Sequence, residues 1–416
     1  MSKLQPVRGT QDICGEDARR FAFVVETFYR VAAAFGFERI SLPIFEFTEV
    51  FRRPLGDSSD VVTKEMYTFK DRGGEEITLR PEVTASIARA YLSEGMQQKG
   101  VVKLATHGAM FRYERPQKGR YRQFHQLDSE IIGAPEPAAD VEIIALAWQV
   151  LKALGISKNV VLNLNTLGDS ESRSKYRSAL VKFLEDKKTK LSKESRERLK
   201  KNPLRILDTK DAGDLALLKK APSMGDFLNK ASADFFRDVQ AGLKNLGIPY
   251  LNNERLVRGL DYYCHTAFEF ITEDLGAQGT VIGGGRYDGL IGMMGGPETP
   301  GTGWAGGIER LALMVKTLPP RPRPVVFVPM TGMAEALSQR LCFDLREAGI
   351  FADMAFRGNL KKRLQKANRE NAGYAVIIGE DEMKSGKLTL RDLDTGIQTE
   401  IAAAKLLGFL KKPAGS

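Results

Sequence analysis

The chain has 416 residues, of which 43% are hydrophobic and 27% charged, as is usual for globular proteins of two or three domains. Its apolar runs are far shorter than the ~20 residues of a membrane span, and its first residues lack the apolar core of a signal peptide, so we expect a cytosolic protein. The three scattered cysteines argue against a disulfide scaffold or a structural zinc site, and the net charge of +10 fits either a polyanionic partner or a solvated basic surface.

Apolar residues recur with helical or strand spacing through the first 160 residues. The pattern predicts a helix over 16–36, a strand-like stretch over 40–44, a hairpin of 66–69 with 77–79, a helix from about 82 to 95, strands over 101–112 and 123–132 joined by a basic loop, and a helix that closes at Gly155.

The character of the chain changes near residue 168. Residues 182–201 hold nine lysines and arginines against four acidic residues, with apolar residues at helical spacing just before them. This pattern predicts a helical insertion ending near Gly247. Strands are expected again over 266–272 and 279–284, followed by a helix from about Ile308.

A proline-rich run at 319–324 (PPRPRP) is the clearest linker, because proline stiffens the chain and cannot join a central sheet. Beyond it, strand patterns at 325–328 and 374–379 alternate with helices over 333–348 and 360–371. Such alternation is typical of a small α/β domain.

Residues 301–306 (GTGWAG) match the dinucleotide fingerprint G-x-G-x-x-G of nicotinamide dehydrogenases. The fingerprint requires a strand directly before it, whereas glycines and prolines at 295–300 predict a turn. The sequence therefore favours a glycine-rich entry to a helix, where backbone can approach a ligand.

A basic block extends over residues 111–126 (FRYERPQKGRYRQFHQ). Four arginines and one lysine stand against one glutamate in 112–122, and the flanking strands should hold Arg112 at the start of the loop. An arginine is permanently charged and forks onto phosphate oxygens. The block predicts a nucleotide site; the alternative is a solvated basic hairpin.

Seven short segments, in order along the chain, carry a family resemblance. Residues 37–43, 111–114 (FRYE) and 306–311 (GGIERL) resemble the three signatures of class II aminoacyl-tRNA synthetases, and the proline of the first lies at the dimer interface in that class. Four further segments resemble signatures of the histidyl-tRNA synthetase family: 6–10 (PVRGT), 79–84 (LRPEVT), 256–263 (LVRGLDYY) and 283–289 (GGGRYDG).

The resemblance implies an α+β fold: a class II antiparallel-sheet catalytic domain with a helical insertion, followed by a small α/β anticodon-binding domain. The implied boundaries are 1–167 for the first part of the catalytic core, 168–247 for the insertion, 248–318 for the second part, 319–324 for the linker and 325–416 for the anticodon-binding domain.

The implied reaction joins L-histidine to ATP, giving histidyl-adenylate and pyrophosphate, and then transfers histidine to the 3′-terminal adenosine of tRNA(His). The resemblance places Arg112 and Arg258 at the α-phosphate, Arg310 at the γ-phosphate, Phe124 on the adenine and Glu114 at its exocyclic amine. Mg²⁺ is expected to accompany ATP, without assigned protein ligands.

For histidine itself, the resemblance assigns Glu82, Thr84 and Gln126 to the amino-acid backbone, Glu130 and Tyr263 to the ring, and Tyr262 and Tyr287 to the lining of the pocket. Because the adenylate phosphate can act as base in the transfer, His107, His125 and His265 receive no role.

Two basic surfaces are candidates for tRNA. Arg115 and Gln117 resemble residues that meet the acceptor stem, while Lys362 and Lys366 follow helical spacing and suit the anticodon stem, with 357–359 as a further contact. A solvated helix face is the alternative for the second surface, and the insertion at 182–201 could also touch tRNA. The family implies a homodimer.

Two further interpretations stay open within the resemblance. One is a synthetase-like, histidine-binding regulatory subunit of ATP phosphoribosyltransferase. Such subunits typically lose ATP-facing arginines and the anticodon domain, whereas Arg112, Arg258, Arg310 and some ninety residues beyond the linker are present here. The other is a synthetase for another amino acid, which the signature at 258–263 disfavours.

Overall fold

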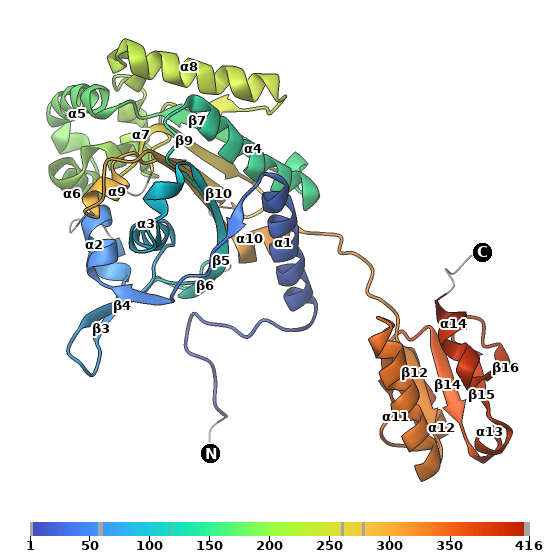
Figure 1. The fold of residues 1–416 in the computed structure, drawn as a ribbon. Helices are drawn as coiled ribbons and strands as arrows, with labels where there is room; N and C mark the ends of the chain where they lie inside the picture. The colour runs from blue at the N-terminus through green and yellow to red at the C-terminus, as the bar shows by residue number, and fades with distance from the viewer. Residues whose placement is uncertain (1–2, 57–60, 118, 259–261, 277–278, 412–416) are drawn as a thin grey trace. The chain divides into compact units, whose positions relative to one another are not determined.

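The computed structural model describes residues 3–56, 61–117, 119–258, 262–276 and 279–411. Residue 118 of the basic loop and residues 259–261 of the 256–263 segment lie outside the described residues. The chain forms two compact units, Met1–Leu318 and Pro319–Ser416 (Figure 1). No described helix is long and apolar enough to cross a membrane. The cytosolic location stays a prediction.

The first unit is built on an eight-stranded sheet (Figure 1). All its internal neighbours pair antiparallel, and only the two short edge strands β1 and β8 pair parallel. In spatial order the strands are β1 (Glu38–Arg39), β5 (Val102–Phe111), β6 (Gln123–Ile132), β11 (Gly301–Gly307), β10 (Thr280–Arg286), β9 (Cys264–Ile271), β7 (Val161–Thr166) and β8 (Leu251–Asn252). The strands expected over 101–112, 123–132, 266–272 and 279–284 are confirmed.

Alternation along β6 separates the two faces of this sheet, because successive strand side chains point to opposite sides. Leu127 and Ile131 enter one apolar core with α1 (Gly15–Ala34), α4 (Pro137–Ala153), α8 (Lys230–Asn245) and α10 (Ile308–Met314). Trp304 of β11 joins the same core and donates its indole N–H to the Ile143 carbonyl of α4 at 3.0 Å. Phe124 and Ile132 face the opposite side, which bears a second core and the site described below.

The second core lies under α2 (Glu49–Leu55), α3 (Thr84–Ser93) and α9 (Leu290–Met293). Beside it is a three-stranded sheet of β2 (Phe45–Phe47), β4 (Glu76–Leu79) and β3 (Tyr67–Lys70), so the predicted hairpin is confirmed. The strand predicted over 40–44 is wrong, since strands lie on both sides of it. Pro43 has no N–H for a ladder, and the Arg80 side chain takes the carbonyls of Leu42 and Pro43.

The glycines of 301–306 form strand β11 itself, and α10 follows directly. The glycine-rich run therefore leads directly into a helix, as predicted, and the turn lies before it, but the run itself is a strand. A βαβ dinucleotide site is excluded, as the sequence indicated, because both neighbours of β11 are antiparallel. The glycines serve close packing instead: a Cβ at Gly303 would collide with the carboxylate of Glu130, and one at Gly301 with the ring of Tyr287.

The region 168–247 is helical, with α5 (Ser170–Glu185), α6 (Lys193–Lys201), α7 (Ala212–Leu218) and α8. Side chains of α5 to α7 form their own apolar cluster around Tyr176, Leu180 and Leu199. Val239 and Leu243 of α8 instead join the core of the large sheet. The exact boundaries of an insertion domain stay a prediction.

The second unit holds a five-stranded sheet in the order β13 (Ala352–Met354), β12 (Val325–Pro329), β14 (Tyr374–Ile378), β15 (Lys387–Asp392) and β16 (Gln398–Ala402). The first three strands are parallel and the last two antiparallel. Its helices are α11 (Gly332–Glu347), α12 (Leu360–Arg369), α13 (Glu380–Ser385) and α14 (Leu406–Leu410). The predicted strands and helices of the α/β domain are confirmed.

Candidate active site

A cavity of about 450 Å³ opens on the second face of the large sheet. It collects residues from β6, β9, β10, β11, α10, the start of α3 and the loop between β5 and β6, which are far apart in sequence. Ten of the residues singled out from sequence line it: Glu82, Thr84, Arg112, Glu114, Phe124, Gln126, Arg258, Tyr262, Tyr263 and Arg310.

Two arginines are fixed at one side of this cavity by backbone carbonyls. Arg112 donates its Nε–H to the Pro81 carbonyl at 2.9 Å and lies over the Phe124 ring, 5.4 Å from its centroid. Arg310 of α10 donates to the carbonyls of Gly119 at 3.1 Å and Thr280 at 2.7 Å. Burial and the neighbouring guanidinium groups of Arg120 and Arg112 lower the pKa of Arg310. Such crowded positive charge favours a polyanionic ligand.

Arg258 is the third arginine of the cavity. Its guanidinium forms an ion pair with Glu269 of β9 and lies 5.4 Å from the centroid of the Tyr263 ring. A Cβ at Gly283 of the neighbouring strand would lie 2.6 Å from Nη1 of Arg258 and would push the guanidinium out of its present position. The position of the Arg258 guanidinium is therefore set by its ion pair with Glu269 and by the space above Gly283.

Glu114 is paired with Arg120 in this structure. Its side chain lines the cavity and is only 10% exposed. An adenine amine at this position would have to compete with Arg120 for the carboxylate.

Glu130 lies beneath the cavity and is 1% exposed. It accepts hydrogen bonds from the Thr84 hydroxyl at 2.7 Å and the Tyr287 hydroxyl at 2.5 Å. Burial raises its pKa to about 8. Tyr287 in turn packs edge-on to Tyr262, with ring centroids 5.8 Å apart. Neither Glu130 nor Tyr287 is part of the cavity wall, but both support it.

The amino-acid end of the predicted site also contains Glu82, which is buried and accepts the Ala85 backbone N–H at 3.0 Å. Burial raises the pKa of Glu82, while this hydrogen bond and the charge of Arg112 act in the opposite direction. Two carboxyl groups and several hydroxyls thus lie in or beneath the same cavity as the three arginines. The arrangement can hold the ammonium group of an amino acid beside a nucleoside triphosphate.

Sequence reasoning missed five charged residues of the cavity wall: Arg120, Asp128, Asp208, Glu269 and Glu309. Glu309 accepts two bonds from His125, one from the backbone N–H at 3.0 Å and one at Nδ1 at 2.7 Å. Asp128 was detectable, because it alternates with Gln126 and Glu130 and so shares their face.

Other predicted residues stand apart from this cavity. Arg115 and Gln117 are exposed on the loop, where Gln117 exchanges backbone hydrogen bonds with Arg120 at 2.9 and 3.0 Å. Lys362 and Lys366 lie on α12 of the second unit; Lys362 is exposed, and Lys366 forms ion pairs with Asp353 at 3.4 Å and Glu370 at 3.5 Å.

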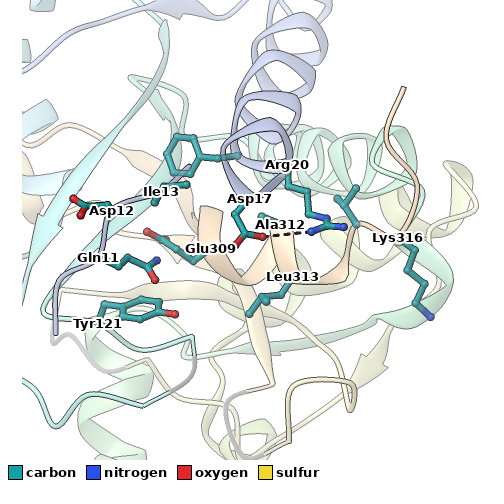
Figure 2. A pocket seen from close by; sticks show the side chains of 12 residues that line it. Gln11, Asp12, Ile13, Asp17, Arg20, Tyr121, Glu309, Ala312, Leu313 and Lys316 are labelled. Carbon is teal, nitrogen blue, oxygen red and sulfur yellow. Dashed lines mark hydrogen bonds and ion pairs between the residues drawn. The ribbon is translucent and has the colours of Figure 1, made fainter. Parts of the chain in front are cut away.

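A second cavity of about 440 Å³ lies between the start of α1 and α10. Figure 2 shows Glu309 and Tyr121, which belong to both cavities, near Gln11, with the Asp17–Arg20 pair on α1. Its lining mixes acidic, basic and apolar side chains without an arginine cluster. The first cavity is therefore the candidate active site.

Among the described residues, no group of three or more His, Cys, Asp or Glu side chains is placed to hold a metal ion. A divalent ion at this site would take its ligands mainly from phosphate oxygens and water, as Mg²⁺ commonly does.

The antiparallel sheet with this arginine-lined cavity is the catalytic domain of a class II aminoacyl-tRNA synthetase, and an anticodon-binding domain follows it. The family model for histidyl-tRNA synthetase matches residues 9–311, and the model for the anticodon binding domain matches 324–413. The chain belongs to the histidyl-tRNA synthetase family.

Curated relatives match this chain along its whole length. A histidine–tRNA ligase of Gluconacetobacter diazotrophicus is 54% identical over 415 residues, covering 100% of both chains. One of Rhodospirillum rubrum is 55% identical over 413 residues, covering 99% of this chain and 100% of the relative. The crystal structure of apo S. aureus histidyl-tRNA synthetase covers 99% of this chain and 100% of its own, with 35% identity and a TM-score of 0.83. These relatives favour the ligase over the regulatory subunit.

Proposed function

We propose that the chain activates L-histidine with ATP and transfers it to the 3′-terminal adenosine of tRNA(His). The observation that carries the proposal is one cavity lined by three arginines and, beside them, a cluster of buried carboxyl and tyrosine side chains. A nucleotide can bind to the arginines while the ammonium group and ring of an amino acid bind to the carboxyl and hydroxyl groups.

The activation step needs no protein nucleophile. A carboxylate oxygen of histidine attacks the α-phosphorus of ATP, and the bond from that phosphorus to the bridging oxygen of pyrophosphate breaks. We assign Arg112 and Arg258 to the α-phosphate oxygens and Arg310 to the γ-phosphate. Prepositioned cations stabilise the charge of the transition state without reorganising. Their backbone and carboxylate partners hold them in place.

The adenine is proposed to stack on Phe124, with its exocyclic amine at Glu114. Because Glu114 is paired with Arg120 here, binding of adenine requires this pair to loosen. Arg120 would then be free to turn toward the phosphates. Mg²⁺ would arrive bound to the phosphates of ATP and neutralise part of their charge.

We assign the imidazole ring to Glu130 and Tyr263, and the backbone of histidine to Glu82, Thr84 and Gln126. Tyr262 lines the cavity, and Tyr287 lies behind the wall, where its hydroxyl donates to Glu130. A site that hydrogen-bonds a polar ring rejects analogues lacking it by roughly 10⁴-fold or more, because its buried polar groups are left unpaired.

The deciding experiment is ATP–pyrophosphate exchange with each of the twenty amino acids. Exchange with histidine alone is expected. Exchange with a different amino acid would overturn the substrate assignment, and no exchange with any would support the regulatory, histidine-binding subunit.

For tRNA, we propose that the exposed residues Arg115 and Gln117 meet the acceptor stem and that Lys362 and Lys366 meet the anticodon stem. The exposure of Arg115, Gln117 and Lys362 and the positive charge of the arginine and the lysines support this role, since lysine and arginine at phosphates release counterions. Double substitution of Arg115 and Gln117 by alanine should raise the KM for tRNA and leave pyrophosphate exchange unchanged. Loss of exchange would contradict the assignment.

We also propose a homodimer. Just beyond Pro43, three phenylalanines stand on one face of the small sheet, because Phe47 and Phe69 both pair with Ile77 and Phe45 is two residues from Phe47. Phe45 is 56% exposed, Phe47 59% and Phe69 48%. Clustered exposed aromatics of this kind mark protein interfaces. Sedimentation of Phe47→Ser with Phe69→Ser should give monomers, and an unchanged dimer would exclude this face.

A further inference from the structure

Asp128 is a wall residue of the active-site cavity to which no role has been assigned above. It stands in the middle of β6, paired with Thr106 on β5 and Ala305 on β11. Strand alternation places its side chain on the same face as Gln126 and Glu130. It therefore lies between a residue assigned to the backbone of histidine and one assigned to its ring.

The carboxylate of Asp128 is buried and has no hydrogen-bond partner among the described residues. Asp128 is 1% exposed, and neither Oδ1 nor Oδ2 is bonded; Oε1 of Gln126 is also buried and unbonded. A buried polar group without a partner is unfavourable, and a buried charge far more so. Two such acceptors on one strand face, at a substrate cavity, indicate that the substrate supplies the donors.

The neighbouring charged groups donate no hydrogen bond to Asp128 among the described residues. Arg80 donates its Nε–H to the Ala109 carbonyl at 2.9 Å, and Arg112 donates to Pro81. Glu82 and Glu130 are acceptors with donors of their own. Burial first, and then the nearby Glu130 and Glu82, raise the pKa of Asp128 well above its usual range, against the weaker opposing effect of Arg80 and Arg112. A cation bound beside Asp128 would stabilise its ionised form and so lower its pKa.

We propose that Asp128, together with Gln126, binds the α-ammonium group of L-histidine and is a specificity-determining residue of this site; the proposal rests on the function proposed above. An ammonium group carries three N–H donors and a positive charge, which matches two unbonded acceptors of which one is a carboxylate. A neutral imidazole offers a single N–H donor, and the ring end already has Glu130, which is held by Thr84 and Tyr287.

Two analogues of histidine separate the ammonium contact from a merely structural role. Histidinol keeps the ammonium group and the ring, whereas imidazole-4-propionate keeps the ring and the carboxylate but lacks the ammonium. Each is measured as a competitive inhibitor of histidine-dependent pyrophosphate exchange, with the full-length protein and with Asp128→Asn. Ser129→Ala is the matched control, because Ser129 is the next buried residue of β6 and points to the other face.

Asp128→Asn should weaken histidinol by about tenfold or more, the contribution of a hydrogen bond to a charged group. Inhibition by imidazole-4-propionate should not change, and Ser129→Ala should affect neither analogue. Equal weakening of both analogues, or of neither, would overturn the proposal. If Asp128→Asn does not fold, Asp128→Ser is measured with the same expectations. A wild-type protein without histidine-dependent exchange would refute the proposed function instead.

Discussion

Gly303 of β11 lies directly opposite Glu130 of β6, and the carboxylate of Glu130 occupies the space that a side chain at 303 would fill. The glycine of an apparent dinucleotide fingerprint thus leaves room for the side chain to which the histidine ring is assigned. The buried carboxylate and the missing side chain require each other.

Gly303→Ala should displace Glu130 and damage histidine binding. Overpacking of this kind costs about 1–3 kcal/mol of stability, and the displaced carboxylate should raise the KM for histidine in pyrophosphate exchange while the KM for ATP stays near normal. Gly332→Ala is the control, because a Cβ at the start of α11 meets nothing within 4 Å. Equal histidine KM values in Gly303→Ala and wild type would show that Glu130 does not need this space.

Replacing the titratable carboxyl group of Glu130 should change how stability depends on pH. The pKa of Glu130 is raised by burial from 4.5 to about 8 in the folded protein. Between these values the folded state keeps a proton that the unfolded state has released, so the unfolding free energy falls as pH rises toward 8. Glu130→Gln has no carboxyl group that titrates here. Without ligand, its Tm should therefore rise relative to that of the wild type as the pH increases between the two pKa values.

The same substitution tests the role in binding. Glu130→Gln and Glu130→Ala should both raise the histidine requirement of pyrophosphate exchange. The alanine variant keeps the fold but leaves the hydroxyls of Thr84 and Tyr287 without their shared acceptor. Parallel Tm curves for Glu130→Gln and wild type would contradict the pH argument, and an unchanged histidine KM would contradict the ring assignment.

Arg258→Lys should slow activation although the charge is kept. Lysine cannot reproduce the planar fork that lies between Glu269 and the phosphate position. Removing one such stabilising donor costs about 10²–10³ in kcat, so the exchange rate should fall by that order with a smaller change in the histidine KM. Glu269→Gln should reduce the exchange rate less than Arg258→Lys does, since the arginine remains. Arg237→Lys, at an exposed ion pair, is the control. A loss confined to the histidine KM would place Arg258 at the amino acid instead.

Local patterns predicted most elements of both units because their signals are local. The strands over 101–112 and 123–132 and the helix at 308 follow from apolar spacing alone. The stretch at 40–44 failed because its carbonyls are taken by Arg80, which lies far away in sequence. The same holds for β11, where glycines that usually mark turns are required by side chains of neighbouring strands.

The candidate site likewise contains residues that could be predicted from the sequence and residues that could not. Its arginines could be named from sequence because short signatures surround them, and the family resemblance assigned their roles. Arg286, inside the GGGRYDG signature, proves to be structural: it is fully buried, pairs with Asp140 and donates to the Ala134 carbonyl at 3.0 Å. Glu269 was missed because its importance comes from sheet register that no short segment contains. Asp128 was missed although its alternation with Gln126 and Glu130 along β6 could have revealed it.

Lys362 and Lys366 offer a matched pair for testing tRNA binding by the second unit. Lys362 is exposed at the first turn of α12, whereas the ammonium of Lys366 is already shared by Asp353 and Glu370. Lys362→Ala should therefore weaken tRNA binding more than Lys366→Ala and reduce the slope of log affinity against log salt by about one, as expected for one lost phosphate contact. The measurement is the tRNA KM of aminoacylation over a range of salt, with pyrophosphate exchange as the control that should not change. A larger effect of Lys366→Ala would mean that tRNA breaks the Asp353 ion pair on binding.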